Sequence, residues 1–200
     1  MTSSLSTSST RLFVRAGAAL CLGALPLLAS AHGTDAAHAH TGFAEGLAHP
    51  YTGLDHLAAM LAVGLWSGSG ASRRAWVAPL SFVGLMLAGV LLAAGGWALP
   101  AIEPMIATSL LALGLLLAAR QQLPAPVAAA LVGGFALFHG AAHGMELGDS
   151  AAAVTGMLLG TASLHLMGWL AGRSLQQRHG WVTRAAGLGV AVFGSALLLA

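Results

Sequence analysis

The stretch AWVAPLSFVGLMLAGVLLAAGGW, residues 75–97, carries no charged side chain and decides the fold class. A helix needs about 20 apolar residues to cross the roughly 30 Å hydrocarbon core of a bilayer, and this stretch is long enough. The rest of the chain is similar in character: 57% of its 200 residues are hydrophobic, 7% are charged, and the mean hydropathy is +0.81. Soluble domains average about 25% charged residues. The composition therefore predicts that most of this chain faces lipid.

Further apolar stretches predict an all-α membrane protein, a bundle of six transmembrane helices over residues 49–200. These stretches lack the alternation of polar and apolar residues that marks a membrane β-strand, so we expect helices. Glycines in the fourth and fifth spans, among them Gly140 and Gly156, fit either a path for ions or close helix packing, and we expect close packing. The expected spans are residues 49–66, 75–97, 102–119, 125–144, 151–172 and 181–200.

Residues 1–31 have the layout of a cleavable bacterial signal peptide. Arg11 and Arg15 precede an apolar run at residues 16–28, and the small residues of 29–31 form a cleavage site. The alternative is a first membrane helix that stays attached, although the run is short for a span. The single cysteine, Cys21, lies in this segment. Because the segment would be removed, the mature chain would have no thiolate to offer as a metal ligand.

Residues 32–48 are expected to form a periplasmic leader of the mature chain. It contains His32, His38 and His40. A short histidine-containing segment can concentrate metal ions near an entrance, and it can equally be a leader without a metal role.

Charge asymmetry predicts the orientation of the spans. Arginines follow the first, third and fifth spans, whereas acidic residues fall at the opposite ends. Because arginine-rich connections face the cytoplasm, we expect a multi-pass protein of the bacterial inner membrane with both mature termini in the periplasm. The residues concerned are Arg73, Arg74, Arg120, Arg173 and Arg178 on one side, and Asp35, Glu45, Glu103, Glu146 and Asp149 on the other.

A first group of polar side chains lies at the expected periplasmic start of the first span, in the run HPYTGLDHLAAM at residues 49–60. In one continuous helix, His49 and His56 would share a face about 10 Å apart along the axis. Asp55 is next to His56, and Met60 lies one turn below it. Ionisable groups inside a membrane are costly and usually mark function. Met60 fits either a ligand on the transport path or a core position, and we expect it in the core.

A second group lies at the expected periplasmic end of the fourth span, in the run FHGAAHGME at residues 138–146. His139 and His143 stand one helical turn apart, the spacing with which one helix holds one metal ion, and Glu146 follows. If the two spans are neighbours, two tiers of ligands form: an outer tier of His49, His143 and Glu146, and an inner tier of Asp55, His56 and His139. Imidazole plus carboxylate suits nickel, cobalt, zinc or copper(II) without distinguishing among them.

Two further polar residues lie outside these motifs. His165, alone and deeper in the fifth span, fits either an inner relay for an ion or a packing contact between helices. Glu103, near the start of the third span, fits either an entry vestibule or a position at the membrane interface.

Both motifs resemble those of the HupE/UreJ family. The first carries His49-Pro50-x-x-Gly53-x-Asp55-His56, followed by Met60 and Val63-Gly64, and the second carries Phe138-His139-Gly140-x-Ala142-His143-Gly144-x-Glu146. The resemblance covers essentially the whole chain. It implies a nickel, sometimes cobalt, permease of the bacterial inner membrane that supplies hydrogenase or urease, with a functional link to the proteins that mature these enzymes. By matching position, the implied functional residues are His49, Asp55, His56, His139, His143 and Glu146, with Glu103 as the family's acidic residue near the third span.

The chain contains no P-loop, so we expect secondary or facilitated import, with Ni²⁺ or Co²⁺ as the transported ion and no permanent cofactor. The formal charge of +2 and the lack of a basic stripe argue against nucleic-acid binding. One rival interpretation is a metal-dependent intramembrane hydrolase, in which a fixed zinc activates water with Asp55 or Glu146 as base. Another is an accessory membrane protein that binds metal without transporting it. Flux of an exchangeable metal would favour the importer, which is not an enzyme.

Overall fold

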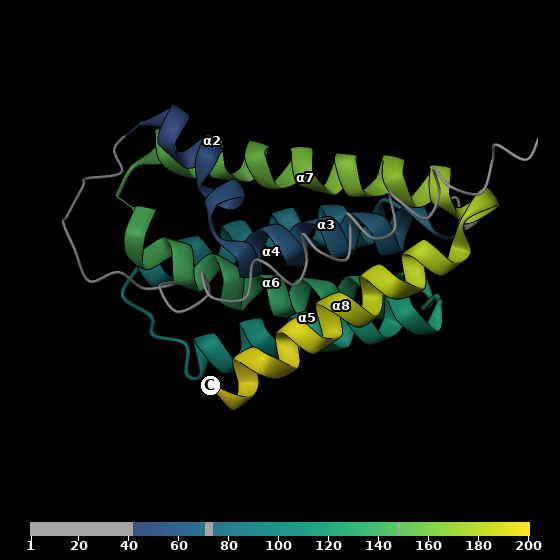
Figure 1. The fold of residues 1–200 in the computed structure, drawn as a ribbon. Coiled ribbons are helices and arrows are strands. Elements are labelled where there is room, and N and C mark those ends of the chain that lie inside the picture. Colours follow the sequence, from purple (N-terminus) through teal and green to yellow (C-terminus); the bar gives the residue numbers. More distant parts are fainter. Residues whose placement is uncertain (1–41, 71–73, 148) are drawn as a thin grey trace, which may run out of the picture. The chain divides into compact units, whose positions relative to one another are not determined.

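The computed structural model describes residues 42–70, 74–147 and 149–200, apart from the side chains of residues 176–178. The described residues all belong to one compact unit, Ala39–Ala200. The predicted signal peptide and most of the predicted leader, with His32, His38 and His40, lie outside them. Within the described ranges the regular elements are α-helices, as predicted (Figure 1). They are α2 (Phe43–Thr52), α3 (Leu54–Gly68), α4 (Val77–Ala94), α5 (Ile102–Ala119), α6 (Ala125–Leu147), α7 (Ala151–Arg178) and α8 (Gly180–Leu199).

Five of these helices are long and apolar enough to cross a membrane, judged by length and composition. They are the counterparts of the predicted second to sixth spans, which agrees with a multi-pass membrane protein. The largest difference in their bounds is in α7, which continues to Arg178 instead of ending at residue 172. The five candidate spans are Val77–Ala94, Ile102–Ala119, Ala125–Leu147, Ala151–Leu175 and Gly180–Leu199.

The predicted first span is broken into two helices at Gly53, so the prediction of one continuous helix over residues 49–66 is wrong. Gly53 has an extended backbone with φ −84° and ψ 119°. Pro50 lies inside α2 and cannot donate a backbone hydrogen bond there. At the end of α2, the Thr52 hydroxyl donates to the His49 carbonyl at 2.8 Å. With 15 residues, α3 is short for a span.

The break changes how the first motif is presented. His49 belongs to α2 and His56 to α3, so the two imidazoles do not share a face of one helix. Helical structure also begins at Phe43, inside the predicted leader of residues 32–48. A side chain at Gly53 would crowd the first turn of α3, because a Cβ atom there would lie 3.2 Å from the Asp55 Oδ1 atom.

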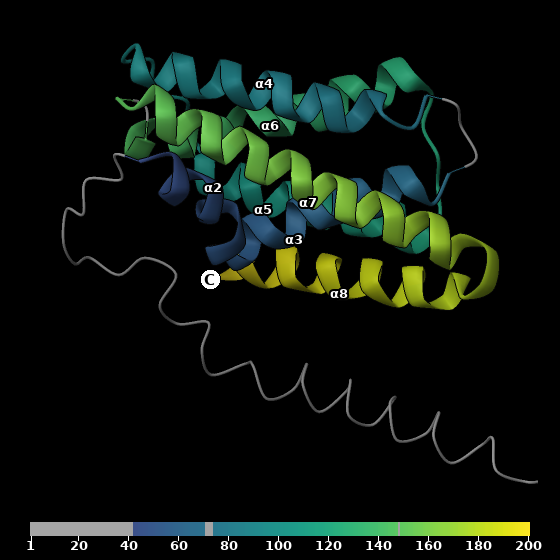
Figure 2. The ribbon, with the colours of Figure 1, turned by 90° about the horizontal axis from the view of Figure 1, so that it is seen from above.

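Four pairs of helices pack closely: α2 with α7, α3 with α7, α4 with α6, and α5 with α8 (Figures 1 and 2). Glycine allows the close approach in each pair. A Cβ atom on Gly140 would collide with the Met86 carbonyl, one on Gly156 with the Phe43 carbonyl, and one on Gly187 with the backbone of α5. The predicted packing role of the glycines in the fourth and fifth spans is confirmed.

The two ends of the bundle differ in charge. The Trp66 Nε1 atom, near the end of α3, donates to the Gln121 carbonyl at 2.7 Å, just beyond α5. Arg74 and Arg120 belong to connections at this end, whereas Glu103 begins α5 and Glu146 ends α6 at the other. The histidines of both motifs gather at the acidic end, where α2, α3 and α6 meet.

Candidate metal centre

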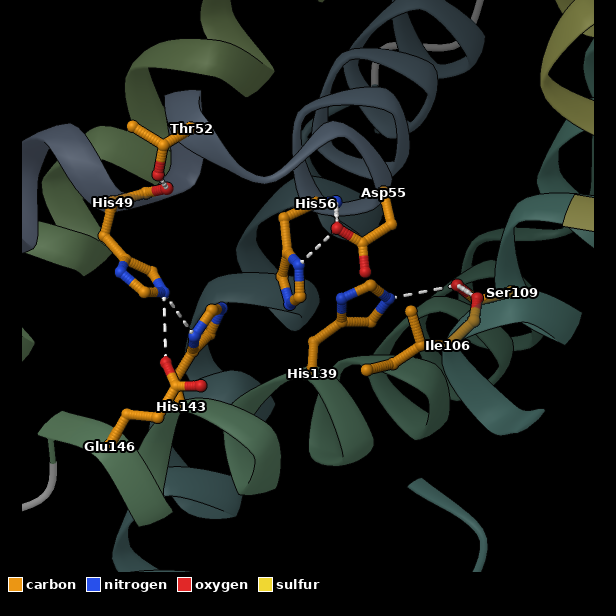
Figure 3. A network of polar contacts seen from close by, with 9 residues as sticks. All are labelled: His49, Thr52, Asp55, His56, Ile106, Ser109, His139, His143 and Glu146. Carbon is orange, nitrogen blue, oxygen red and sulfur yellow. Dashed lines mark hydrogen bonds and ion pairs between the residues drawn. The ribbon is translucent and has the colours of Figure 1, made fainter. Parts of the chain in front are cut away.

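Three side chains meet where α2 lies beside the end of α6. We call them the outer group: His49, His143 and Glu146. The His49 Nε2 atom lies 3.1 Å from the His143 Nδ1 atom and 3.5 Å from the Glu146 Oε2 atom (Figure 3). One ligand atom from each residue lies within 4.8 Å of the other two. These are the residues expected as the outer tier. Two imidazoles and a carboxylate at this separation form a donor set suited to one divalent ion.

His56 begins a second group, and Asp55 fixes its orientation. Both lie in the first turn of α3. The Asp55 Oδ1 atom lies 3.0 Å from the His56 Nδ1 atom and also accepts from the His56 backbone N–H at 2.8 Å. An ionised carboxylate only accepts, so this contact assigns the proton to Nδ1 and leaves the lone pair on Nε2. A carboxylate behind an imidazole is the arrangement that orients histidine ligands in metal sites.

His139 is oriented by a residue that the sequence analysis did not identify, Ser109 of α5. The buried Ser109 hydroxyl donates to the Ile106 carbonyl at 2.6 Å and lies 3.0 Å from the His139 Nε2 atom (Figure 3). A hydroxyl has one proton. Because the Ser109 hydroxyl donates its proton to the Ile106 carbonyl, its oxygen accepts a hydrogen bond from the His139 Nε2–H group. The lone pair of His139 is therefore on Nδ1.

Three imidazoles from α3 and α6 come together as a group that we call the histidine cluster, His56, His139 and His143. The His56 ring centroid lies 4.3 Å from that of His143 and 5.0 Å from that of His139, and Figure 3 shows His56 between the other two. The His56 Nε2, His139 Nδ1 and His143 Nε2 atoms are buried and have no hydrogen-bond partner among the described residues. Leaving a buried polar atom unpaired costs about 1–3 kcal/mol. A cation bound at any of these atoms would give that atom a partner.

The cluster differs from the expected inner tier in its membership. His143, expected only in the outer tier, contributes to both groups, with Nδ1 toward His49 and Nε2 unpaired in the cluster. Asp55 makes its hydrogen bonds behind His56, on Nδ1, away from the Nε2 atom.

The other predicted residues lie outside these two groups. Met60 is fully buried in the apolar core, which agrees with its packing interpretation. Glu103 is exposed in the first turn of α5. His165 is buried in α7, and the Phe82 ring of α4 contacts both it and His139, with centroid distances of 5.1 and 5.4 Å.

Ser109 was missed because its position in the site depends on helix packing. It lies in the apolar third span and belongs to neither histidine motif. A hydroxyl in the third span, at a depth similar to that of His139, was the available signal for Ser109. Its partner could be named only once α5 was known to lie beside α6.

Comparison with known proteins agrees with the motif resemblance. The family model described as "HupE / UreJ protein" matches residues 19–197. The chain is 46% identical over 126 residues to Protein HupE of Rhizobium leguminosarum bv. viciae, a match that covers 63% of this chain and 65% of that protein. No solved structure matches this chain. Because the family model covers most of its length and both histidine motifs, the chain belongs to the HupE/UreJ family.

Proposed function

We propose that this chain imports divalent nickel or cobalt across the bacterial inner membrane and supplies the metal to a hydrogenase or a urease. The observation that carries the proposal is the packing of His56 against His139 and His143, three imidazoles that each have a buried ring nitrogen without a hydrogen-bond partner among the described residues, next to the outer group. Imidazole ligands without thiolate suit borderline dications such as Ni²⁺ and Co²⁺ better than Mg²⁺ or Ca²⁺. Membership of the HupE/UreJ family supports the same reading.

The two groups support a stepwise path. The Glu146 side chain is 55% exposed and offers a negative charge to an arriving cation. The ion would bind first to the outer group, with His49, His143 and Glu146 as ligands. His143 presents its other ring nitrogen to the cluster, so an ion can pass from one group to the next around a shared residue. His56 and His139 would then complete its coordination.

The membrane potential suffices to drive such import. With both termini in the periplasm, the acidic end of the bundle faces outward, and a dication moves toward the negative cytoplasm. Each charge gains about 2.3 kcal/mol per 100 mV, or about 4.6 kcal/mol for a dication. That energy sustains a gradient of more than about a thousandfold, which is ample for a trace metal.

The proposal is tested with the full chain in liposomes that enclose a metal-sensitive dye. An inside-negative potential is applied and Ni²⁺, Co²⁺ or Zn²⁺ is added outside. We expect flux of Ni²⁺ or Co²⁺ that rises with the potential and falls at least about tenfold in His56→Ala and His139→Ala, as for loss of a metal-site group. His179→Ala, at an exposed histidine between α7 and α8, is the matched control and should retain flux.

Two results would contradict import. Metal that binds the cluster without crossing the membrane would support the accessory protein. Metal that remains bound through chelation, again without flux, would support the hydrolase.

A further inference from the structure

Arg120 ends α5 in a backbone conformation that is unusual for arginine. Its φ is 55° and its ψ is 30°, in the left-handed region. A helix that ends in this conformation usually has glycine there, and sometimes asparagine. The Cβ atom of any other residue makes the conformation costly. The shape of the helix end therefore does not account for an arginine at this position.

The Arg120 guanidinium extends from α5 to Gly180, the first residue of α8. A Cβ atom on Gly180 would lie 2.8 Å from the Arg120 Nη1 atom, so the glycine leaves room for the guanidinium. The first N–H groups of a helix have no partner within it and carry a partial positive charge. His179, which precedes α8, makes no side-chain hydrogen bond to this turn. Two positive groups therefore meet here, and an anion between them would be stabilised by both.

A buried hydroxyl of α8 is directed to the same place. Thr183 is 1% exposed, and its Oγ1 atom has no hydrogen-bond partner among the described residues. Gly187 of α8 lies against Ala118, near the end of α5. Gly194 lies against Leu111, so the two helices run in opposite directions. Thr183 is one turn before Gly187 on the same side, so it is level with the residues that follow Ala118. Because helical side chains lean toward the start of their helix, its hydroxyl lies over the first turn of α8.

The charges at this end of the bundle identify the class of ligand. The described carboxylates belong to the opposite end: Glu45, Asp55, Glu103, Glu146 and Asp149. The ammonium group of a zwitterionic lipid would find none of them here, whereas a phosphate group would meet a guanidinium and helix N–H groups.

The surroundings favour a lipid as the source of the phosphate. Trp181, in the first turn of α8, is 63% exposed, and tryptophan prefers the headgroup region of a bilayer. Basic pockets between membrane helices are known to bind anionic headgroups. Here the pocket would lie between α5 and α8, which pack side by side (Figure 1).

We propose that the end of α5 and the start of α8 form a binding site for the phosphate group of an anionic phospholipid. The Arg120 guanidinium binds the phosphate oxygens, and the first N–H groups of α8 donate to them. The Thr183 hydroxyl rotates to donate as well. The bound lipid links α5 to α8 and so stabilises the bundle. This site is separate from the histidine cluster and does not depend on the import function.

The site is tested with the full chain in detergent, by thermal unfolding during titration with phosphatidylglycerol, phosphatidylcholine or inorganic phosphate. We expect phosphatidylglycerol to raise the melting temperature. Phosphatidylcholine should have little effect, because its choline group has no carboxylate partner. Inorganic phosphate should also have little effect, because it lacks the acyl chains that would hold it beside the helices.

Arg120→Asn separates lipid binding from the role of this residue at the helix end. Asparagine accepts the left-handed conformation, so the melting temperature without lipid should be unchanged or higher. The phosphatidylglycerol concentration at half of the thermal shift should rise at least about tenfold. Thr183→Val keeps the shape of the side chain and should raise it about tenfold. Arg184→Gln is the control, because it removes an exposed arginine at the next position of α8, and it should bind as the wild type does.

An Arg120→Asn variant that responds to phosphatidylglycerol like the Arg184 control would overturn the site. Wild-type binding by Thr183→Val would remove the hydroxyl from it. Equal stabilisation by inorganic phosphate would overturn the lipid as the source of the phosphate group, and equal stabilisation by phosphatidylcholine would overturn the preference for an anionic headgroup.

Discussion

Ser109→Ala removes a hydroxyl that would not contact the metal ion itself. We expect it to weaken metal binding because the hydroxyl orients His139. In the wild type, the Ser109 oxygen accepts from the His139 Nε2 atom at 3.0 Å and so keeps the lone pair on Nδ1. Alanine leaves the Nε2–H group buried without a partner, which costs about 1–3 kcal/mol. The other tautomer, with its proton on Nδ1, then becomes competitive, and that tautomer has no lone pair in the cluster.

The expected loss of Ni²⁺ affinity is about 10- to 100-fold, the usual effect of removing a group that orients a metal ligand. Affinity is measured by titration of the full chain in detergent. Ser195→Ala is the control, since the Ser195 hydroxyl donates to the Ala191 carbonyl within α8. In a double-mutant cycle, Ser109→Ala should add little to His139→Ala. Full additivity, or an affinity equal to that of the Ser195 control, would refute the assignment of Ser109.

Three further predictions concern the site and its scaffold. Asp55→Asn should lower Ni²⁺ affinity about 10- to 100-fold while the chain stays folded, because a neutral amide holds the His56 tautomer less firmly; unchanged affinity in the same titration would contradict this role. Glu146→Gln should slow the capture of Ni²⁺ at low concentration more than it lowers flux at saturation, because it removes only the exposed charge; equal loss at all concentrations would argue against an entry role. Gly140→Ala should destabilise the protein by about 1–3 kcal/mol, because its methyl group would meet the Met86 carbonyl, whereas Gly134→Ala, which meets nothing within 4 Å, should be neutral or stabilising in thermal unfolding.

Most of the fold could be predicted from the sequence, because a helix is the ready way to bury backbone polar groups in lipid. The bounds of α5, Ile102–Ala119, were predicted to the residue because Pro100 and Arg120 limit the apolar run. The break at Gly53 was not predicted. A proline and a glycine inside an apolar run fit a continuous, kinked helix as well as two helices, and the packing of α2 against α7 through Gly156 depends on tertiary structure.

The members of the candidate site could be predicted, but their arrangement could not. Helical spacing placed His139 and His143 on one side of one helix. His56 contacts His143, with the ring centroids 4.3 Å apart. This contact depends on the direction that α3 takes after the break in the first span. Ser109 entered the site only through the packing of α5 against α6.

The central claim, that the cluster binds one dication through three imidazoles, is tested most directly by X-ray absorption spectroscopy of the Ni²⁺-loaded full chain. We predict scattering from three imidazole rings around a single nickel, reduced by one ring in each of His56→Ala, His139→Ala and His143→Ala and unchanged in His179→Ala. A spectrum without imidazole scattering, or one that these three substitutions leave unaltered, would contradict the account.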